Sequence, residues 1–220
     1  MAKRKLQQFA ELNTFNNVIQ HPFGKENFDH PLKGKWASDF FRNEQPIILE
    51  LGCGKGEYTI GLARKHPENN YLGMDIKGNR IWRGAKTALE EQIQNAGFIR
   101  SQVDRLENFF APGEIAGIWI TFPDPKPKKG DARKRLTSAE MAAKYRMVLK
   151  EGGTVQLKTD SAFNYDFTIE TIKENGFKLL RHSMDIDRDF PGEELLLIRT
   201  YYETKFREKG FPIRFVSYIP

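Results

Sequence analysis

From Pro46 onward the chain alternates between short apolar runs and longer amphipathic segments. The apolar runs are flanked by turn residues and predict buried strands at 47–51, 71–74, 98–103, 115–122 and 154–159. Hydrophobic residues at helical spacing predict helices at 57–65, at 79–96 with Gly97 as its end, around Met141, Tyr145 and Val148, and at 161–175. Two further strand-like segments, 177–184 and 194–203, follow without a helix between them.

Strands that alternate with helices of this length build a parallel sheet that is covered on both faces. The two last strands lack such a helix, so we expect them to pair as an antiparallel hairpin. The predicted fold class is therefore α/β, with a doubly wound, seven-stranded, mostly parallel sheet and an antiparallel C-terminal edge hairpin. We assign residues 46–220 to this domain and residues 1–45 to an N-terminal extension that packs on the domain or on a partner.

Four carboxylates are expected at the edge of the sheet where the parallel strands end. In open sheets of this kind, ligands bind beyond the carboxyl ends of the strands. Those ends carry Glu50, Asp75, Asp124 and Asp160. Like charges held close together raise each other's pKa, so an edge this acidic indicates a function.

The segment from Leu49 to Gly56, LELGCGKG, joins a predicted strand to a predicted helix. Its glycines, Gly52, Gly54 and Gly56, do not have the G-x-G-x-x-G spacing of dinucleotide sites. Glu50 would repel a pyrophosphate, whereas it would attract the ammonium and sulfonium groups of S-adenosylmethionine. Asp75 ends the next strand, where an acid accepts hydrogen bonds from ribose hydroxyls. The alternative is a glycine-rich turn without a ligand.

A second unusual segment follows the strand at 115–122. Asp124 lies between two prolines, which hold it in an extended geometry. Residues 126–135 then carry six cations against Asp131, a net +5, out of a formal net charge of +6 for the chain. With a sequence pI near 9.3, this segment indicates a polyanionic partner. The alternative is a solvated basic loop.

Composition adds few further constraints. The only cysteine is Cys53, so an internal disulfide is excluded and a reducing cytoplasm is expected. The N-terminal residues include cations but no apolar segment of a secretory signal, and no run approaches the length of a membrane span. The sequence does not distinguish between a monomer and a homodimer.

These motifs together resemble the bacterial tRNA (guanine-N7-)-methyltransferases, a family within the Rossmann-like, class I S-adenosylmethionine-dependent methyltransferases. The resemblance covers about residues 46–206. Its more specific parts are the F-P-D-P element at 122–125 with its basic continuation, and the late T-x-x-E at 200–203. The motifs that carry the resemblance are ELGCGKG at 50–56, YLGMD at 71–75, FPDP at 122–125 with Lys128–Lys129 and Lys134–Leu136, KTD at 158–160, and TYYE at 200–203.

The resemblance implies roles for individual residues. Glu50 and Asp75, with Gly52, Gly54 and Gly56, correspond to the cofactor-binding positions, and Asp124 to the acid at the cofactor and catalytic centre. Substrate-binding positions correspond to Lys128, Asp160, Thr200, Tyr201, Tyr202 and Glu203. The implied partner is tRNA, methylated in its variable loop and held by the segment from Lys126 to Arg135. No metal is implied.

Two positions depart from the family pattern. Gln102 stands where the family usually has an aspartate that meets the adenine amino group, and Asp104 follows two residues later. Lys126 stands where the family tends to have tryptophan or another bulky ring, so if that ring helps to hold RNA, this chain must use charge instead.

Guanine N7 has an exposed lone pair, so methyl transfer to it needs no general base. We expect catalysis to come from alignment of the reacting atoms and from a carboxylate near the ring as it becomes cationic. Asp124 is the first candidate for that carboxylate and Asp160 the second. The alternative for Asp160 is a helix N-cap shared with Ser161. Thr200 and Glu203 could instead be exposed positions on an edge strand.

Other functions fit less well. A methyltransferase for exocyclic amines would carry an N-P-P-Y or D-P-P-Y element where this chain has Phe122–Pro125. A nucleotide-linked oxidoreductase conflicts with Glu50 and with the glycine spacing. A non-catalytic RNA-binding relative would have no reason to keep Glu50, Asp75 and Asp124 together.

Overall fold

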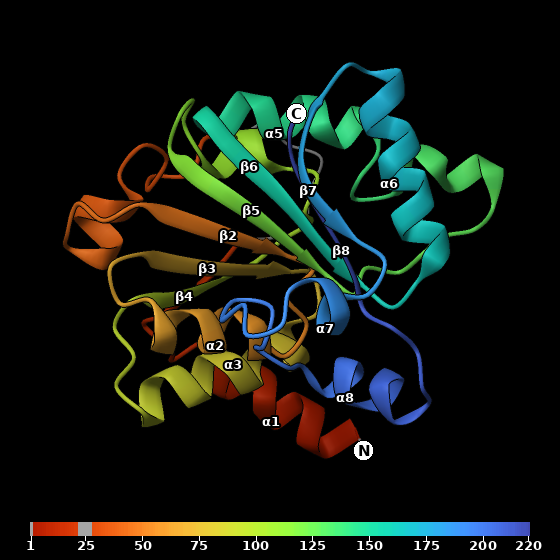
Figure 1. Cartoon of the computed structure of the whole chain (residues 1–220). Helices are drawn as coiled ribbons and strands as arrows, with labels where there is room; N and C mark the ends of the chain where they lie inside the picture. The colour runs from red at the N-terminus through yellow and green to blue at the C-terminus, as the bar shows by residue number, and fades with distance from the viewer. Residues whose placement is uncertain (1, 22–27) are drawn as a thin grey trace.

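The computed structural model of the chain describes residues 2–21 and 28–220, with side chains from residue 5 onward. Within these residues, eight strands form one sheet in the order β1-β4-β3-β2-β5-β6-β8-β7 (Figure 1). Their bounds are β1 (Val18–Gln20), β2 (Ile47–Leu51), β3 (Asn70–Asp75), β4 (Ala96–Arg100), β5 (Ile115–Thr121), β6 (Leu149–Thr159), β7 (Lys178–Ser183) and β8 (Arg214–Ile219). The pairs from β1 to β6 are parallel, and β8 runs antiparallel to both β6 and β7. The α/β fold class is therefore confirmed.

Helices cover both faces of the sheet, as expected for strands that are buried on both sides. In Figure 1, α5 and α6 lie above the sheet, and α1, α2 and α3 lie below it. The helix bounds are α1 (Ala2–Leu12), α2 (Glu57–Lys65), α3 (Gly78–Glu90), α4 (Leu106–Phe109), α5 (Ala139–Val148), α6 (Ala162–Glu174), α7 (Ile186–Asp189) and α8 (Tyr201–Glu208), with a π-helical turn η1 (Trp36–Phe41) and a 3₁₀ turn η2 (Lys129–Lys134).

Each face of the sheet has its own apolar core. The core under α4, α5 and α6 includes Trp36, Leu51 and Tyr145, whereas the core under α1, α2 and α3 includes Tyr58, Phe98 and Trp119. Trp119 is buried in the sheet as predicted. The pleat produces this division because successive side chains of a strand point to opposite faces.

The topology places one crevice at the centre of the sheet. From β2 the chain moves outward through β3 to β4, and then crosses back to β5 on the other side of β2. Pairing aligns the strand ends, with Leu51 opposite Met74 and Ile120, and Thr121 opposite Lys158. A reversal of strand order of this kind is where ligands bind in open α/β sheets.

The N-terminal extension contributes to the sheet itself. The chain was expected to form seven strands, and β1 adds an eighth by pairing in parallel with β4. Helix α1 packs on α3, where Glu11 accepts a hydrogen bond of 2.9 Å from the indole nitrogen of Trp82. Residues 2–20 therefore pack on the main domain at two places.

Two sequence-based predictions of secondary structure were wrong, one for the helix after Asn79 and one for residues 194–203. The helix after Asn79 ends at Glu90 rather than at Gly97, because Gln92 adopts a left-handed φ of 57° and Gly97 lies within β4. Residues 194–203 form no strand; residues 201–203 begin α8, and the closing strand is β8. Leu195, Leu196 and Ile198 pack under α2 instead of pairing in the sheet, which a short apolar run alone cannot reveal.

We predict that Gly84→Ala destabilises the protein, although alanine ordinarily stabilises a helix by about 1 kcal/mol over glycine. A Cβ at position 84 would lie 2.7 Å from both the carbonyl oxygen of Lys55 and the ring of Phe98. We expect the free energy of unfolding in urea to fall by about 1–3 kcal/mol. Gly130→Ala is the control, because nothing lies within 4 Å of a Cβ there. An unchanged or higher stability of Gly84→Ala would contradict this packing.

Candidate active site

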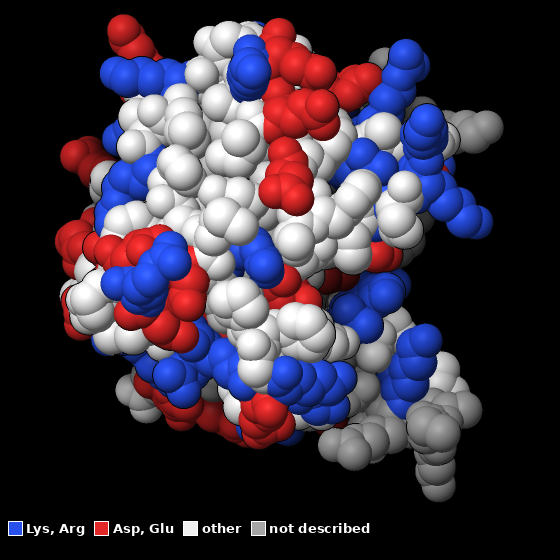
Figure 2. Space-filling view, turned by 45° about the vertical axis from the view of Figure 1, so that its right-hand side comes forward, with Lys and Arg blue, Asp and Glu red and all other residues white. Residues whose placement is uncertain are grey.

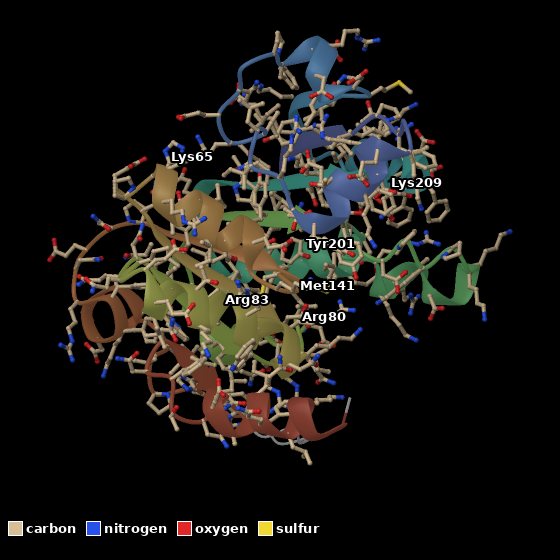
Figure 3. All side chains as sticks on the ribbon, turned by 90° about the horizontal axis from the view of Figure 1, so that it is seen from below. Lys65, Arg80, Arg83, Met141, Tyr201 and Lys209 are labelled. Atoms are coloured by element: carbon tan, nitrogen blue, oxygen red, sulfur yellow. The ribbon has the colours of Figure 1, made fainter. Side chains whose placement is uncertain are left out.

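A cavity of about 540 Å³ opens at the carboxyl edge of the sheet, between α3, α5 and the segment after β5. Its lining includes Gly52, Asp75, Gln102 and Asp124, four of the predicted site residues, which are far apart in the sequence. Figure 3, which views the molecule from below, places Arg80 of α3 and Met141 of α5 near one another, and both line this cavity. Asp104 lines it as well, so Gln102 and Asp104 both stay candidates for the adenine contact.

The glycine loop between β2 and α2 has the backbone geometry that only glycine adopts readily. Gly52, Gly54 and Gly56 have φ values of 72°, 56° and 70°. The Asp75 carboxylate accepts hydrogen bonds from the backbone amides of Gly54 (3.0 Å) and Lys77 (2.8 Å). Asp75 therefore joins the loop to the start of α3 and places its carboxylate at the cavity wall.

Glu50 lies behind the glycine loop and is only 2% exposed. One of its oxygens accepts hydrogen bonds from the amide of Thr59 (2.9 Å) and from the hydroxyl of the same residue, and the other accepts from the Thr121 hydroxyl at 2.5 Å. Burial raises the pKa of Glu50 to about 7, against the opposite effect of these hydrogen bonds. Glu50 thus connects α2, β2 and β5, and it is not among the residues that line the cavity.

The F-P-D-P segment is held in an unusual backbone conformation. Phe122 and Lys126, at either end of it, have positive φ values of 48° and 44°, which are uncommon for residues other than glycine. The Phe122 amide donates to the Lys158 carbonyl at 2.8 Å, and the Asn164 side chain donates to the Pro123 carbonyl at 3.0 Å. Asp124 between them is exposed to the cavity. Strained backbone that hydrogen bonds from neighbouring segments hold in place is characteristic of functional sites.

The basic segment after Asp124 contains two kinds of cation. Lys128 and Lys129 are exposed, whereas Lys134 and Arg133 form surface ion pairs with Asp131 (3.0 Å) and Glu140 (3.1 Å). Figure 1 shows this segment as the green coil on the right, and Figure 2 shows Lys and Arg side chains gathered along the right-hand side of the molecule. The exposed cations are placed to meet a polyanion.

Arg135 is not one of these exposed cations. It is 7% exposed, and its guanidinium lies over the rings of Phe163 (4.6 Å) and Phe167 (4.4 Å). It donates to the carbonyl oxygens of Lys126 (3.1 Å), Pro127 (3.5 Å) and Lys128 (3.4 Å). Arg135 therefore fixes the backbone of the basic segment from within. The sequence analysis counted Arg135 among the residues that hold tRNA, and a buried guanidinium does not agree with that prediction.

The T-x-x-E motif forms the start of α8, with its first and last residues buried and the two residues between them exposed. Thr200 caps the helix by accepting from the Glu203 amide at 3.2 Å, and Glu203 is fully buried in an ion pair with Lys158 at 2.7 Å. The alternative of exposed edge-strand positions is therefore wrong for both. Tyr201 and Tyr202 are exposed, and with Thr200 they line a second cavity of about 80 Å³ against the glycine loop.

The remaining predicted substrate residues lie outside the lining of these two cavities. Asp160 is half-buried, and burial raises the pKa of its carboxyl. The N-cap of α6 is Ser161, whose hydroxyl accepts from the Asn164 amide at 3.2 Å. The Asp160 carboxylate is thus not used as the helix cap. Lys128 is exposed on the basic segment.

Sequence reasoning missed several residues of the site. Ile76, directly after β3, and Val103, three residues after the end of β4, line the main cavity, and their position next to Asp75 and Gln102 was a usable signal. Met141 and Leu136 complete an apolar wall. Arg80 lines both cavities. Arg80, Leu136 and Met141 become neighbours only through tertiary packing, and no local pattern in the sequence indicates that they do.

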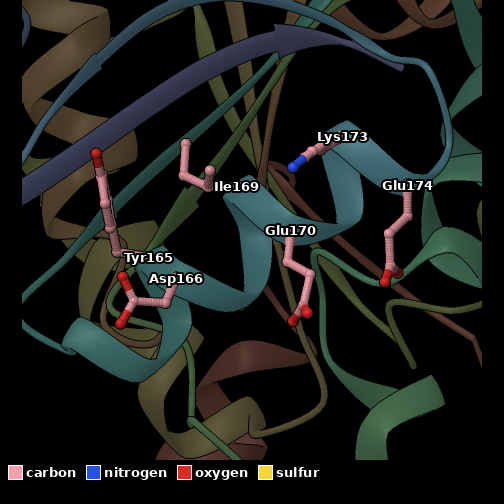
Figure 4. A pocket seen from close by; sticks show the side chains of 6 residues that line it. All are labelled: Tyr165, Asp166, Ile169, Glu170, Lys173 and Glu174. Atoms are coloured by element: carbon pink, nitrogen blue, oxygen red, sulfur yellow. The ribbon is translucent and has the colours of Figure 1, made fainter.

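Another hollow of about 510 Å³ lies along α6 (Figure 4). Its lining residues all belong to that single helix and include Asp166, Glu170 and Glu174. It contains no predicted site residue, so the cavity at the sheet edge remains the candidate site. Among residues 2–21 and 28–220, no group of three His, Cys, Asp or Glu residues is placed to hold a metal ion. No described helix is long and apolar enough to span a membrane.

The main cavity fits S-adenosylmethionine. Asp75 offers a carboxylate where ribose hydroxyls are bound in this topology, Ile76 and Met141 offer apolar surface for an adenine, and the glycine loop allows close approach of the backbone. The fold and this cavity together define a class I S-adenosylmethionine-dependent methyltransferase. The solved 16S rRNA methyltransferase KamB has the same fold, with a TM-score of 0.63 at 16% identity, covering 88% of this chain and 95% of that one.

Comparison with known proteins narrows the class to a family. A family model described as "Putative methyltransferase" matches residues 44–215. The tRNA (guanine-N(7)-)-methyltransferase of Christiangramia forsetii is 46% identical over 220 residues, covering 99% of this chain and 98% of that protein. The protein of the same name from Porphyromonas gingivalis is 45% identical over 211 residues, covering 94% and 86%. The chain belongs to the tRNA (guanine-N(7)-)-methyltransferase family.

We predict that Glu50 makes stability depend on pH in an unusual direction for a carboxylate. Its pKa is about 7 when folded and near 4.5 when unfolded, so the unfolded chain releases the proton first as pH rises. The free energy of unfolding of the wild type, minus that of Glu50→Gln, should therefore fall between about pH 4.5 and 7, by up to ~3 kcal/mol. Urea titrations at a series of pH values measure this difference. A difference that stays constant or rises over this range would contradict it.

Proposed function

We propose that this protein transfers the methyl group of S-adenosylmethionine to N7 of a guanosine in tRNA, within the variable loop. The observation that supports this most is the meeting of Asp75, Asp124 and the glycine loop at one cavity, next to a basic segment with exposed lysines. Membership of the family agrees with it. The described residues also explain how the chemistry proceeds without a general base.

The bound cofactor supplies an electrophilic methyl group on a sulfonium. Asp75 binds the ribose, and Gln102 or Asp104 accepts from the adenine amino group; all three line the main cavity. Glu50 sets the position of the glycine loop through Thr59 and Thr121, and Gly52 and Gly54 give the cofactor access to the backbone, while the buried Gly56 lets the loop pack against Phe98 and Gly84. These residues bind and orient the donor, and N7 attacks with its own lone pair.

Asp124 stabilises the guanine ring as it becomes cationic. Its carboxylate is exposed to the cavity, while the surrounding backbone is held by Lys158, Asn164 and Arg135. A carboxylate that is already in place when charge develops lowers the barrier without reorganisation. Asp160 is the second candidate for this role. Lys128 contacts RNA from the basic segment, and Tyr201 and Tyr202 contact it from the other side of the glycine loop.

The reaction is tested by incubating the protein with tRNA and methyl-labelled S-adenosylmethionine and mapping the labelled atom by nucleoside mass spectrometry. We expect 7-methylguanosine at one position in the variable loop. Label on an exocyclic amine would favour a different base methyltransferase. The absence of any transfer, with cofactor bound, would indicate a non-catalytic RNA-binding relative.

We predict that Asp124→Asn lowers the rate of methyl transfer by about 100-fold or more, in line with the loss of one preorganised electrostatic contact. Because Asp124 is exposed and makes a single long contact, with the Lys126 amide at 3.4 Å, the melting temperature should barely change. Single-turnover kinetics with saturating cofactor measure the rate. Retention of most of the wild-type rate would contradict the role of Asp124.

We predict that Lys128→Glu/Lys129→Glu weakens tRNA binding and reduces its salt dependence, because each lost phosphate contact lowers the slope of log K against log salt by about one. Cofactor affinity should change little, since neither residue lines the cofactor cavity. Arg135→Met is the matched comparison within the segment: we expect lower thermal stability, because the guanidinium holds three carbonyl groups. Equal losses of RNA and cofactor binding in the double variant would contradict this division.

A further inference from the structure

We propose that Lys158 is a positioning residue that holds the two walls of the catalytic cleft together, and that Glu203 acts through Lys158 rather than on guanosine. The proposal rests on the proposed function, because it concerns the same cleft. It assigns a role to a residue that has no surface to offer a ligand, and it changes the role that the T-x-x-E motif was expected to have.

The side chain of Lys158 anchors the segment that leads into α8. Its ammonium group is fully buried and donates to the carbonyl oxygens of Leu196 (2.7 Å) and Ile198 (2.8 Å). The same nitrogen lies 2.7 Å from a carboxylate oxygen of Glu203. Two of the three ammonium hydrogens are thus donated to carbonyl groups, and Glu203 balances the charge through the ion pair. One side chain of β6 thereby fixes both the incoming loop and the first turn of α8.

The backbone of Lys158 anchors the opposite wall. Its carbonyl oxygen accepts the hydrogen bond from the Phe122 amide at 2.8 Å, where the chain leaves β5 with a positive φ. Thr121 is paired with Lys158 in the sheet, so this contact extends the strand register into the F-P-D-P segment. The position of Asp124 therefore depends on the backbone of the residue whose side chain holds α8.

The small cavity lies between these two anchored segments. Thr121 and Phe122 line one side, Thr200 to Tyr202 line another, and the glycine loop completes it. The ring of Phe122 also stacks with that of Phe206, on the next turn of α8, at 6.2 Å. Tyr201 is seen near the middle of the molecule in Figure 3, and Arg80, which is labelled below it, lines the same cavity. A shift of α8 would thus open the cleft where the nucleotide enters.

Neither oxygen of Glu203 is exposed to the cleft. It is 0% exposed, one oxygen faces Lys158, and the other accepts from the Nε atom of Arg207 at 2.9 Å. Arg207 is itself paired with Asp187. A direct contact with guanine would require breaking a buried ion pair, which leaves an uncompensated charge. The arrangement therefore favours a structural use of this carboxylate in positioning Tyr201 and Tyr202.

A reversal experiment separates positioning from substrate contact. Lys158→Met and Glu203→Gln each leave a buried partner without its counter-charge, and we expect kcat/KM for tRNA to fall about 10-fold to 100-fold. In Lys158→Met/Glu203→Met both charges are replaced by apolar groups of similar volume, a change that buried ion pairs often tolerate. The double variant removes the unpaired charge but still lacks the donors to Leu196 and Ile198, so it should be less impaired than Lys158→Met without regaining the full wild-type kcat/KM. If Glu203 contacted guanosine, the double variant would be at least as impaired as Lys158→Met.

Two controls keep the outcome interpretable. Ile172→Val removes one methylene from the buried side of α6, in the core on the other face of the sheet, and shows how much activity is lost through reduced stability alone. Cofactor affinity, measured by titration of each variant, should stay within about threefold of the wild type, because Lys158 and Glu203 do not line the cofactor cavity. A Glu203→Gln enzyme with full kcat/KM and only a lower melting temperature would overturn the proposal.

Hydrogen exchange gives a readout that does not depend on activity. In Lys158→Met we expect faster amide exchange in α8 and in residues 122–126, with β2 and β3 unchanged, and only partly restored protection in the double variant, which also lacks the donors to Leu196 and Ile198. Unchanged exchange in both segments would refute the positioning role even if the wild type methylates N7. Failure of the wild type to methylate N7, with these exchange changes present, would instead count against the proposed function alone.

Discussion

The site depends on the hydrogen bonds that meet at the buried carboxylate of Glu50. Thr59 donates to it from the first turn of α2, and Thr121 donates from the last residue of β5, on the other side of the point where the strand order reverses. The glycine loop and the F-P-D-P segment therefore start from the same fixed group. A carboxylate with a pKa near 7 and an exposure of 2% is costly to bury, and three hydrogen bonds offset part of that cost.

Several residues whose chemistry suggests ligand binding serve instead to hold the backbone. Arg135 donates to three carbonyl groups beneath the basic segment, and Glu203 pairs with Lys158 beneath α8. Both are almost completely buried. The exposed residues beside them, Lys128 on one segment and Tyr201 on the other, remain available to RNA. The buried charged residues thus hold the backbone segments that carry the exposed residues, which limits how far the cleft can deform when a large substrate binds.

The strands and helices that surround the site were predictable because local patterns set them. The helix at 57–65 and the strands β2, β3 and β5 agree with their predicted bounds within a residue or two, since apolar runs and flanking Gly or Pro residues mark them. The helix after Asn79 was overextended because Ile93 and Ala96 continue its apolar spacing, although Gln92 turns the chain before them. The segment at 194–203 was misassigned because a buried loop and a strand can share the same apolar composition.

The sequence alone determined the fold class, the acids at the strand ends, and the occurrence of Asp124 directly before a basic segment. Each of these rests on residue type and on spacing along the chain. The tertiary structure alone decided which charges face inward. Lys158 and Glu203 lie 45 positions apart, and their pairing is set by how α8 packs against β6. No local period encodes such a contact. The direction in which a charged side chain points is fixed by the neighbours that desolvate it, and those neighbours are brought together only by folding.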